Sequence, residues 1–246
     1  MMQTGRLIID PPMAGSRNMA VDQAILEHAR DSNQSTLRFY QWKPATISLG
    51  YFQPIETRKT HQRSLQCPIV RRTTGGGAIV HDNELTYSIC VPESNKWSTD
   101  NQRLYALIHN ALIRSLLNWN IHAQLILETL KQENEPFLCF QRRAIGDVTI
   151  NGEKVCGSAQ RRINKSILQH GSILIQRSLN APELPGIVEI SGKAIILNQL
   201  SSALINEIQT EMEISFRPGQ LTASEQKRVV DIQSKRFESD VWISKR

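Results

Sequence analysis

Apolar residues recur at intervals of three and four in the middle of the chain, the spacing of one face of an α-helix. The pattern covers about residues 103–118, where six alanine, leucine and isoleucine side chains share a face. Two residues that cap helices well, Asp100 and Asn101, come directly before it. The segment is therefore predicted to be an amphipathic helix packed on a sheet.

Two further helices are predicted nearer the ends of the chain. The segment 18–30 places alanines and an isoleucine on one face, with Asn18 as its candidate cap. A last helix opens at Thr222, because Glu225 stands three residues later and completes a capping box. The segment 176–192 has prolines and glycines that interrupt any period, and it is predicted to be a loop.

Short runs of β-branched and aromatic residues, separated by Pro, Gly and Asn, predict strands. A further hairpin is predicted over 147–156, because Asn151-Gly152 is a strong signal for a two-residue turn. Strands mixed with helices in this order indicate an α+β fold, with one layer of helices on a central mixed sheet. The strand candidates are 36–42, 46–52, 68–72, 77–82, 85–91 and 167–175.

The hairpin also predicts which side chains share a face. A turn at Asn151-Gly152 pairs Thr149 with Lys154, Asp147 with Cys156 and Val148 with Val155. The valines then belong to the core, and Lys154 lies on the same side as Asp147, Thr149 and Cys156. A solvated hairpin lysine is the simpler interpretation of Lys154, unless the tiny residues that follow it admit a ligand.

Composition limits the classes of protein that fit. The 246 residues are 40% hydrophobic and 21% charged, which is typical of a globular chain and not of a disordered or fibrous one. The apolar runs are only a few residues long, so no membrane segment or signal peptide is predicted and a cytoplasmic location is expected. The formal charge of +6 favours an acidic partner, either a protein or a nucleic acid.

Three segments could line a site. After Lys154 come Gly157, Ser158 and Ala159, whose small size would let a ligand approach the backbone, although packing could explain it equally well. The strand 167–175 has apolar ends around a polar centre that contains His170 and Gly171. The segment 71–82 carries three consecutive glycines, and it matches neither a P-loop nor a dinucleotide fingerprint.

The four cysteines show neither CxxC spacing nor a disulfide framework, so they are expected to be free thiols. Cys90 lies in an apolar strand and Cys67 beside a proline, and both are expected to be structural. Cys139 precedes two arginines, and basic surroundings favour the thiolate that a nucleophilic cysteine requires. Cys156 competes with it through the predicted proximity to Lys154. No metal site is expected, because the histidines are scattered.

Four motifs in order resemble the biotin/lipoate protein ligase family: RRTTGGGAIVHD, a cysteine segment LCF, GEKVCGSAQRR and LQHGSILI. The likeness extends from residue 39 to residue 246. It is strongest to the octanoyltransferase branch whose cysteine lies outside the lysine hairpin. The resemblance implies the fold of the biotin ligase and class II aminoacyl-tRNA synthetase catalytic domains. It also implies one domain over 1–246, with room for a small helical extension from about residue 193.

The resemblance further implies a reaction and its residues. An octanoyl group would pass from acyl carrier protein to a cysteine thioester, and then to a lysine of a lipoyl-carrier protein such as glycine cleavage H protein. No cofactor, nucleic acid or membrane would take part. Cys139 matches the family's nucleophile and Lys154 its site lysine, which would favour the thiolate and polarise the thioester carbonyl. The residues implied to border the acyl chain and thioester are Arg72, Gly75, Gly76, Gly77, His81, Gly157, Ser158, Ala159, His170 and Gly171.

Three alternatives stay open at this stage. An ATP-dependent lipoate ligase would place Lys154 against an adenylate and leave Cys139 incidental. The chain lacks the length for the extra C-terminal domain common in such ligases, although shortened ligases exist. A lipoyl amidotransferase would move acyl chains between two lipoyl-carrier proteins. A protein without catalytic activity could bind carrier proteins or RNA on the same fold. A nucleophilic cysteine favours acyl transfer, because moving an acyl group out of a thioester needs no nucleotide.

Overall fold

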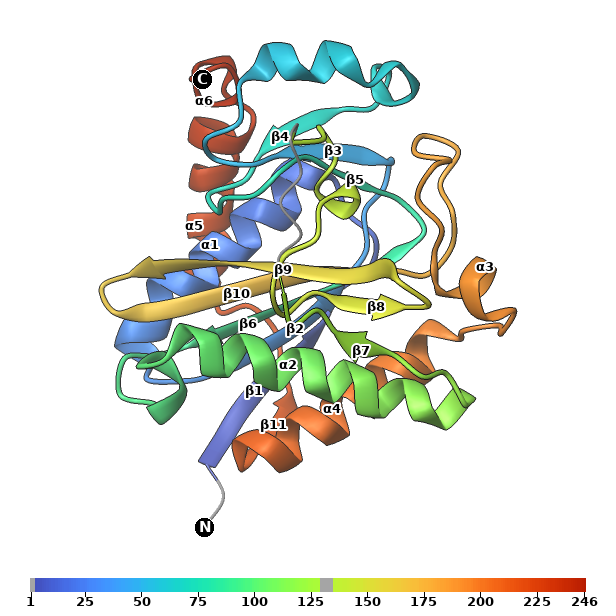
Figure 1. The fold of residues 1–246 in the computed structure, drawn as a ribbon. Helices are drawn as coiled ribbons and strands as arrows, with labels where there is room; N and C mark the ends of the chain where they lie inside the picture. The colour runs from blue at the N-terminus through green and yellow to red at the C-terminus, as the bar shows by residue number, and fades with distance from the viewer. Residues whose placement is uncertain (1–2, 129–134) are drawn as a thin grey trace.

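The computed structural model describes residues 3–128 and 135–246, which form two sheets with helices around them (Figure 1). The larger sheet has eight strands and the smaller has three. The order across the larger sheet is β11 (Ile214–Pro218), β1 (Gln3–Ile9), β2 (Thr36–Tyr40), β6 (Glu84–Val91), β10 (Ser166–Leu174), β9 (Glu153–Ile163), β8 (Val148–Ile150) and β7 (Gln124–Leu125). The order across the smaller sheet is β4 (Ile69–Arg71), β3 (Thr46–Leu49) and β5 (Ile79–His81).

Both sheets are mixed, as the sequence predicts for the fold. In the larger sheet, β1 pairs in parallel with β11 and β2, and the remaining neighbours pair antiparallel. In the smaller sheet, β3 is parallel to β4 and antiparallel to β5. All the predicted strands are present within a few residues. The sequence pattern did not reveal β1, β7 or β11, nor the division of the strands into two sheets.

The helices cover both faces of the larger sheet, so the prediction of a single helical layer is wrong (Figure 1). One face packs on α2 (Asn101–Leu116) and α4 (Leu197–Met212), and the other on α1 (Gly15–Ser32) and α5 (Ala223–Ile232). Both faces of the central strands carry apolar residues, which is why two layers of helices are needed. Two short helices, α3 (Ile187–Ser191) and α6 (Asp240–Ile243), lie outside these layers, and α3 falls inside the predicted loop.

Two of the three predicted helix caps are present in the structure. Asp100 accepts hydrogen bonds from the first backbone N–H groups of α2, and Thr222 and Glu225 form the predicted capping box of α5. Asn18 does not cap α1. The helix begins three residues earlier at Gly15, and the Asn18 amide donates to the carbonyls of Met13 and Gln41 instead.

The Asn151-Gly152 hairpin is present, and both turn residues have the positive φ that a two-residue turn requires. Thr149 faces Lys154 as predicted, but Val148 faces Cys156. A bulge between Val148 and Thr149 shifts the register by one residue, so the other two predicted pairs are wrong. Past the turn, β9 continues to Ile163, and this length carries the small residues 157–159 into the middle of the sheet.

Candidate active site

Cys139 begins a short 3₁₀ turn, Cys139–Gln141, beside the glycine-rich segment. Its backbone N–H donates to the Ala78 carbonyl at 2.7 Å, and the Ala78 N–H donates to the Phe137 carbonyl at 3.0 Å. These two bonds tie the cysteine segment to the chain directly after the three glycines. The Cys139 side chain is partly exposed, so the sulfur is held in place and remains accessible.

Lys154 lies against this cysteine. Its Nζ is 3.8 Å from the Cys139 Sγ and 3.3 Å from the Cys139 carbonyl oxygen. The lysine is only 4% exposed although it stands two residues after an exposed turn, so it is not a solvated hairpin lysine. The structure therefore brings the two predicted catalytic residues into contact.

Asp147 holds the Lys154 ammonium from the other side. Its Oδ2 lies 2.8 Å from Nζ, and both side chains are 2% exposed. The carboxylate also accepts the Ala144 N–H at 2.8 Å and the Tyr105 hydroxyl at 3.3 Å. The charge of Lys154 is consequently balanced by Asp147 inside the protein.

Gly157 makes room for this lysine. A Cβ at position 157 would lie 2.6 Å from the Lys154 Cε and 2.9 Å from its Nζ, distances too short for van der Waals contact. An added Cβ at Gly171 would likewise collide with Ser158 and with the Tyr87 ring. The small residues after Lys154 thus serve packing as well as the surface of the pocket.

Arg72 is the second cation of the site. It is 3% exposed, and its guanidinium donates to the carbonyls of Gly75 and Gly77 at 2.7 Å each, and to the Ser48 carbonyl and hydroxyl. All four acceptors are uncharged. Across residues 3–128 and 135–246, no carboxylate forms an ion pair with Arg72. Burial lowers the pKa of Arg72 to about 10, while the nearby Cys139 acts in the opposite direction.

Gly76 separates this guanidinium from the cysteine. Its φ of +92° is in the left-handed region, which favours glycine. A Cβ there would lie 3.0 Å from the Arg72 Nη2 and 3.9 Å from the Cys139 Sγ. Lys154 and Arg72 therefore both reach the neighbourhood of the sulfur, but only Lys154 has a carboxylate partner in the described chain.

A pocket between the two sheets opens at Cys139. Its walls combine apolar side chains, among them Met19, Trp42 and Ile79, with polar groups from both sheets. Two predicted residues are not in the wall: Lys154, which packs against Gly157, and Gly77, which packs against Arg142. The predicted residues that line the pocket are Arg72, Gly75, Gly76, His81, Cys139, Gly157, Ser158, Ala159, His170 and Gly171.

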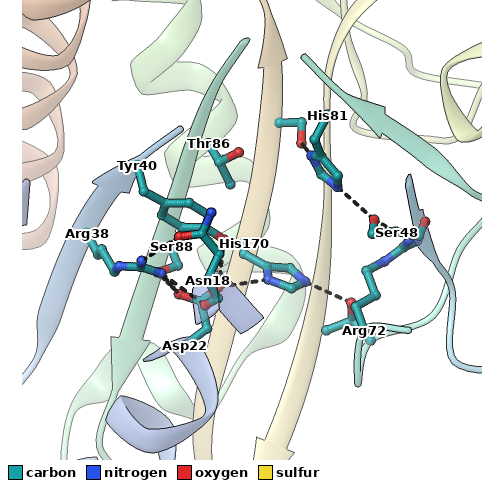
Figure 2. A network of polar contacts seen from close by, with 12 residues as sticks. Asn18, Asp22, Arg38, Tyr40, Ser48, Arg72, His81, Thr86, Ser88 and His170 are labelled. Atoms are coloured by element: carbon teal, nitrogen blue, oxygen red, sulfur yellow. Dashed lines mark hydrogen bonds and ion pairs between the residues drawn. The ribbon is translucent and has the colours of Figure 1, made fainter. Parts of the chain in front are cut away.

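His81 forms a hydrogen bond with Ser48 on one wall of the pocket (Figure 2). Its Nδ1 lies 2.8 Å from the Glu84 Oε1 and its Nε2 lies 2.7 Å from the Ser48 Oγ. Because a carboxylate only accepts, Nδ1 carries the proton and Nε2 accepts from the serine. Burial lowers the pKa of His81, so the ring is neutral at pH 7. The chain of bonds ends at Arg72, whose Nη1 donates to the same hydroxyl at 3.1 Å.

His170 belongs to a second network, centred on Asp22 (Figure 2). Its Nδ1 is 3.1 Å from the Asp22 Oδ2 and its Nε2 is 2.8 Å from the Thr74 Oγ1. Arg38 and Tyr40 also bind the Asp22 carboxylate. Burial opposes ionisation of Asp22, yet Arg38 and the other hydrogen bonds hold its pKa below the usual range. The network connects helix α1 to the segment that precedes the glycines.

The other cysteines lie away from the opening. Cys156 is fully buried, its Sγ is 3.8 Å from the His109 Nε2, and burial raises the pKa of its thiol. Burial also raises the pKa of Cys90 and of Cys67. A buried, protonated thiol is a poor nucleophile. Cys139 is thus the cysteine whose exposure and neighbours suit that role.

The sequence pattern missed several residues that shape this site. Ser48, Glu84 and Asp22 are polar residues inside strands or a helix, and nothing near them in the sequence indicates a shared pocket. Asp147 could be found, because the hairpin places it on the side of Lys154. Within the described ranges, no group of three or more His, Cys, Asp or Glu residues could hold a metal ion. No helix of these ranges is long and apolar enough to span a membrane.

The comparison with protein families agrees with this geometry. Residues 14–203 match the model of the lipoyl protein ligase A/B catalytic domain. The chain belongs to this family. The matched region contains the glycine-rich segment, Cys139, the Lys154 hairpin and His170, so every predicted site residue lies inside it.

Relatives that align over their full length are octanoyltransferases. The chain is 33% identical to octanoyltransferase LipM of Clostridioides difficile and 31% identical to octanoyltransferase LipM of Brevibacillus brevis. Both alignments cover 100% of this chain and 100% of the relative. The resemblance to the octanoyltransferase branch is therefore confirmed over the full length.

Solved structures confirm the fold. Protein Ta0514 from T. acidophilum with bound lipoic acid superimposes with a TM-score of 0.82, at 21% identity, over 99% of this chain and 100% of the other. Lipoate-protein ligase A bound with ATP superimposes with a TM-score of 0.81, at 20% identity, over 98% and 99% of the two chains. The predicted fold of a mixed sheet flanked by helices, of the lipoate protein ligase type, is thus confirmed.

Proposed function

We propose that this chain transfers an octanoyl group from acyl carrier protein to a lysine of a lipoyl-carrier protein, through a thioester on Cys139. Full-length similarity to octanoyltransferases supports octanoyl transfer in lipoate biosynthesis. The observation that carries the mechanism is the contact of a partly exposed cysteine with a buried lysine, Sγ to Nζ 3.8 Å. Glycine cleavage H protein is the acceptor proposed from the family resemblance.

The charges around the sulfur support a thiolate. Lys154 and Asp147 together are neutral, and Arg72 adds one positive charge that no carboxylate of the described chain balances. A buried charge without a partner is costly, so a cation in this position favours an anion beside it. A Cys139 thiolate would place such an anion near Arg72. Lys154 then donates a hydrogen bond to the sulfur, and Arg72 supplies the net charge.

The first half-reaction moves the acyl group onto the enzyme. The Cys139 thiolate attacks the carbonyl carbon of the octanoyl thioester, a new C–S bond forms, and the bond to the donor's thiol breaks. The Lys154 ammonium, 3.8 Å from the sulfur, is placed to stabilise the oxyanion that develops on the carbonyl. The octanoyl chain occupies the pocket, where Met19, Trp42 and Ile79 provide an apolar lining.

The second half-reaction moves the acyl group to the acceptor. The neutral amine of the acceptor lysine attacks the Cys139 thioester, an amide forms, and the Cys139 thiolate leaves. The amine gives up one proton to the solvent as the amide forms. Because the thioester is already activated, neither half-reaction needs ATP or another cofactor. The thiolate left at the end is again held by Lys154 and balanced by Arg72.

The experiment compares two sources of the acyl group. Purified protein is mixed with a lipoyl-carrier protein and either octanoyl-acyl carrier protein without nucleotide, or free octanoate with ATP and magnesium. Octanoylation of the acceptor, read as a mass increase, is expected only with the first source. Modification that requires octanoate and ATP would overturn the proposal in favour of a ligase. Modification that requires a second octanoylated lipoyl-carrier protein as donor would favour an amidotransferase.

A further inference from the structure

A group of aromatic and basic side chains lies on the surface beside the pocket. Tyr51 and Phe52 follow strand β3, Arg161 comes from β9, and Lys245 and Arg246 follow helix α6. The Lys245 Nζ is 3.8 Å from the centre of the Tyr51 ring, and the Cζ atoms of Arg161 and Arg246 are both 5.9 Å from it. Phe52 is 70% exposed. These five residues are named the Tyr51 rim.

The three cations of the rim have no side-chain carboxylate paired with them. None of them forms an ion pair within residues 3–128 and 135–246. The exposed Arg228, in contrast, pairs with Glu27. The hydrogen bond and charge of Lys245 lower the pKa of Tyr51, with smaller contributions from the two arginines. The rim is therefore a compact positive surface that favours an anionic partner.

The rim is fixed next to the glycines that border Cys139. The Tyr51 N–H donates to the Thr74 carbonyl at 2.8 Å, and a Cβ at Gly50 would collide with the Gly76 carbonyl oxygen. Arg161 stands two residues after Ala159, which lines the pocket. A partner bound to the rim would accordingly lie at the opening of the pocket.

Hydrogen bonds hold the C-terminal part of the rim in place. The Trp242 Nε1 donates to the Arg71 carbonyl at 2.8 Å, and the Arg71 Nε donates to the Ile243 carbonyl at 2.8 Å. The Ile55 N–H donates to the Arg246 carbonyl at 3.0 Å. Lys245 and Arg246 are thus presented on a packed segment, so binding need not first order a free chain end.

We infer that the Tyr51 rim is the docking surface for the acidic protein that donates the octanoyl thioester. The inference rests on the proposed function, since that function requires a protein donor whose acyl group must reach Cys139. Three uncompensated cations complement acidic side chains on the donor, and the exposed Phe52 offers an apolar contact between them. Opposite charge at the edge of an interface accelerates association and fixes orientation more than it adds to affinity.

Charge reversal tests the inference. Arg161→Glu and Lys245→Glu each replace a rim cation, and Lys227→Glu changes the net charge equally on the exposed surface of α5. Formation of the acyl-enzyme is measured by intact mass with three donors: octanoyl-acyl carrier protein, octanoyl-coenzyme A, and octanoyl-N-acetylcysteamine, which is small and uncharged. Transfer to the acceptor protein is measured separately. Each rim variant is expected to lose about tenfold or more in kcat/KM with the protein donor, and to keep its rate with the small donor. Lys227→Glu is expected to keep both.

Four outcomes would overturn the inference. The rim variants could keep full activity with the protein donor, or Lys227→Glu could lose as much as they do. The rim variants could lose as much kcat/KM with octanoyl-coenzyme A as with the protein donor. That result would mean that the rim binds the phosphates of the thioester arm and not the carrier protein. They could slow only the transfer to the acceptor, which would make the rim an acceptor surface.

A binding measurement separates failure of the inference from failure of the proposed function. The Cys139→Ala protein is titrated with octanoyl-acyl carrier protein by fluorescence anisotropy, with and without Arg161→Glu. Salt-sensitive binding that weakens about tenfold in the rim variant supports the docking surface, even if Cys139 proves not to be acylated. Binding that Arg161→Glu leaves unchanged refutes it, whatever the enzyme does.

Discussion

Asp147 neutralises Lys154 at a distance of 2.8 Å, in a part of the protein where both side chains are almost completely buried. A lysine paired in this way orients a hydrogen bond toward Cys139, but it contributes little net charge. The net positive charge near the sulfur comes instead from Arg72, which meets only uncharged acceptors in the described chain. The two cations of the site therefore have separable roles.

The buried pair makes a prediction about stability. Asp147→Asn leaves the Lys154 ammonium buried without a counter-charge, and this is expected to cost about 3 kcal/mol of unfolding free energy. The double variant Asp147→Asn/Lys154→Met removes both charges and is expected to be more stable than the single variant. Urea denaturation of the three proteins measures the difference. Equal midpoints for Asp147→Asn and wild type would show that the pair is not buried as described.

Gly157→Ala is predicted to damage catalysis more than folding. The added methyl group would overlap the end of the Lys154 side chain, so the ammonium must move away from Cys139. We expect about a tenfold loss in the rate of acyl-enzyme formation, which corresponds to about 1.4 kcal/mol. The matched control is Gly75→Ala, where an added Cβ meets no atom within 4 Å. Thermal unfolding shows whether both variants fold. If both fold and both keep full activity, the position of the Lys154 ammonium does not affect acyl-enzyme formation.

Removal of the Arg72 charge is predicted to make Cys139 less reactive at neutral pH. In Arg72→Gln, alkylation of Cys139 by iodoacetamide is expected to be about tenfold slower at pH 7, because the thiolate loses its charge partner. An unchanged alkylation rate in this variant would show that the charge of Arg72 does not act on the sulfur. Arg143→Gln, which removes an arginine paired with Glu153, serves as the control and is expected to react like wild type.

The pH dependence of stability follows from His109. Burial lowers the pKa of His109 to about 4, and its ring lies 2.7 Å from the Ser158 Oγ. The unfolded state, with an ordinary pKa near 6.5, binds a proton at a higher pH than the folded state does. The stabilisation that comes from keeping His109 neutral is therefore fully present above pH 6.5. The free energy of unfolding falls by about 3 kcal/mol as the pH drops from about 6.5 to 4.

Chemical denaturation at several pH values checks this prediction. His81, whose pKa is also lowered by burial, adds to the loss in the same direction. His109→Gln retains an amide that can donate to Gly146 and accept from Ser158, and it is expected to flatten the dependence by about one proton. An unchanged slope in this variant would mean that His109 does not titrate as proposed.

The local elements of the fold were largely predictable, because they depend on neighbours in the sequence. Helix α2, the capping box at Thr222 and the Asn151-Gly152 turn each follow from residues within one or two turns of chain. Strand β11 was not predictable, because it forms by pairing with β1 more than two hundred residues away. The register of the hairpin was wrong by one residue because a bulge leaves no clear signal in the sequence.

The part of the site that depends on neighbours in the sequence was also predictable. Lys154 and Asp147 share one hairpin, so their proximity follows from the turn. Cys139 reaches Lys154 only because its segment bonds to Ala78, and the motif order of the family indicated this where spacing could not. The pairing of His81 with Ser48 and Glu84 joins three separate positions of the two sheets, and no pattern of the sequence predicts it.

Cys139 is proposed to carry the acyl group between the donor and the acceptor. Intact-mass analysis after brief mixing with octanoyl-acyl carrier protein, followed by peptide mapping, tests it most directly. We predict one octanoyl group on Cys139 that neutral hydroxylamine removes, absent from Cys139→Ala and retained in Cys156→Ala. An octanoyl group on Cys156, or full transfer activity in Cys139→Ala, would show that Cys139 is not the acyl carrier.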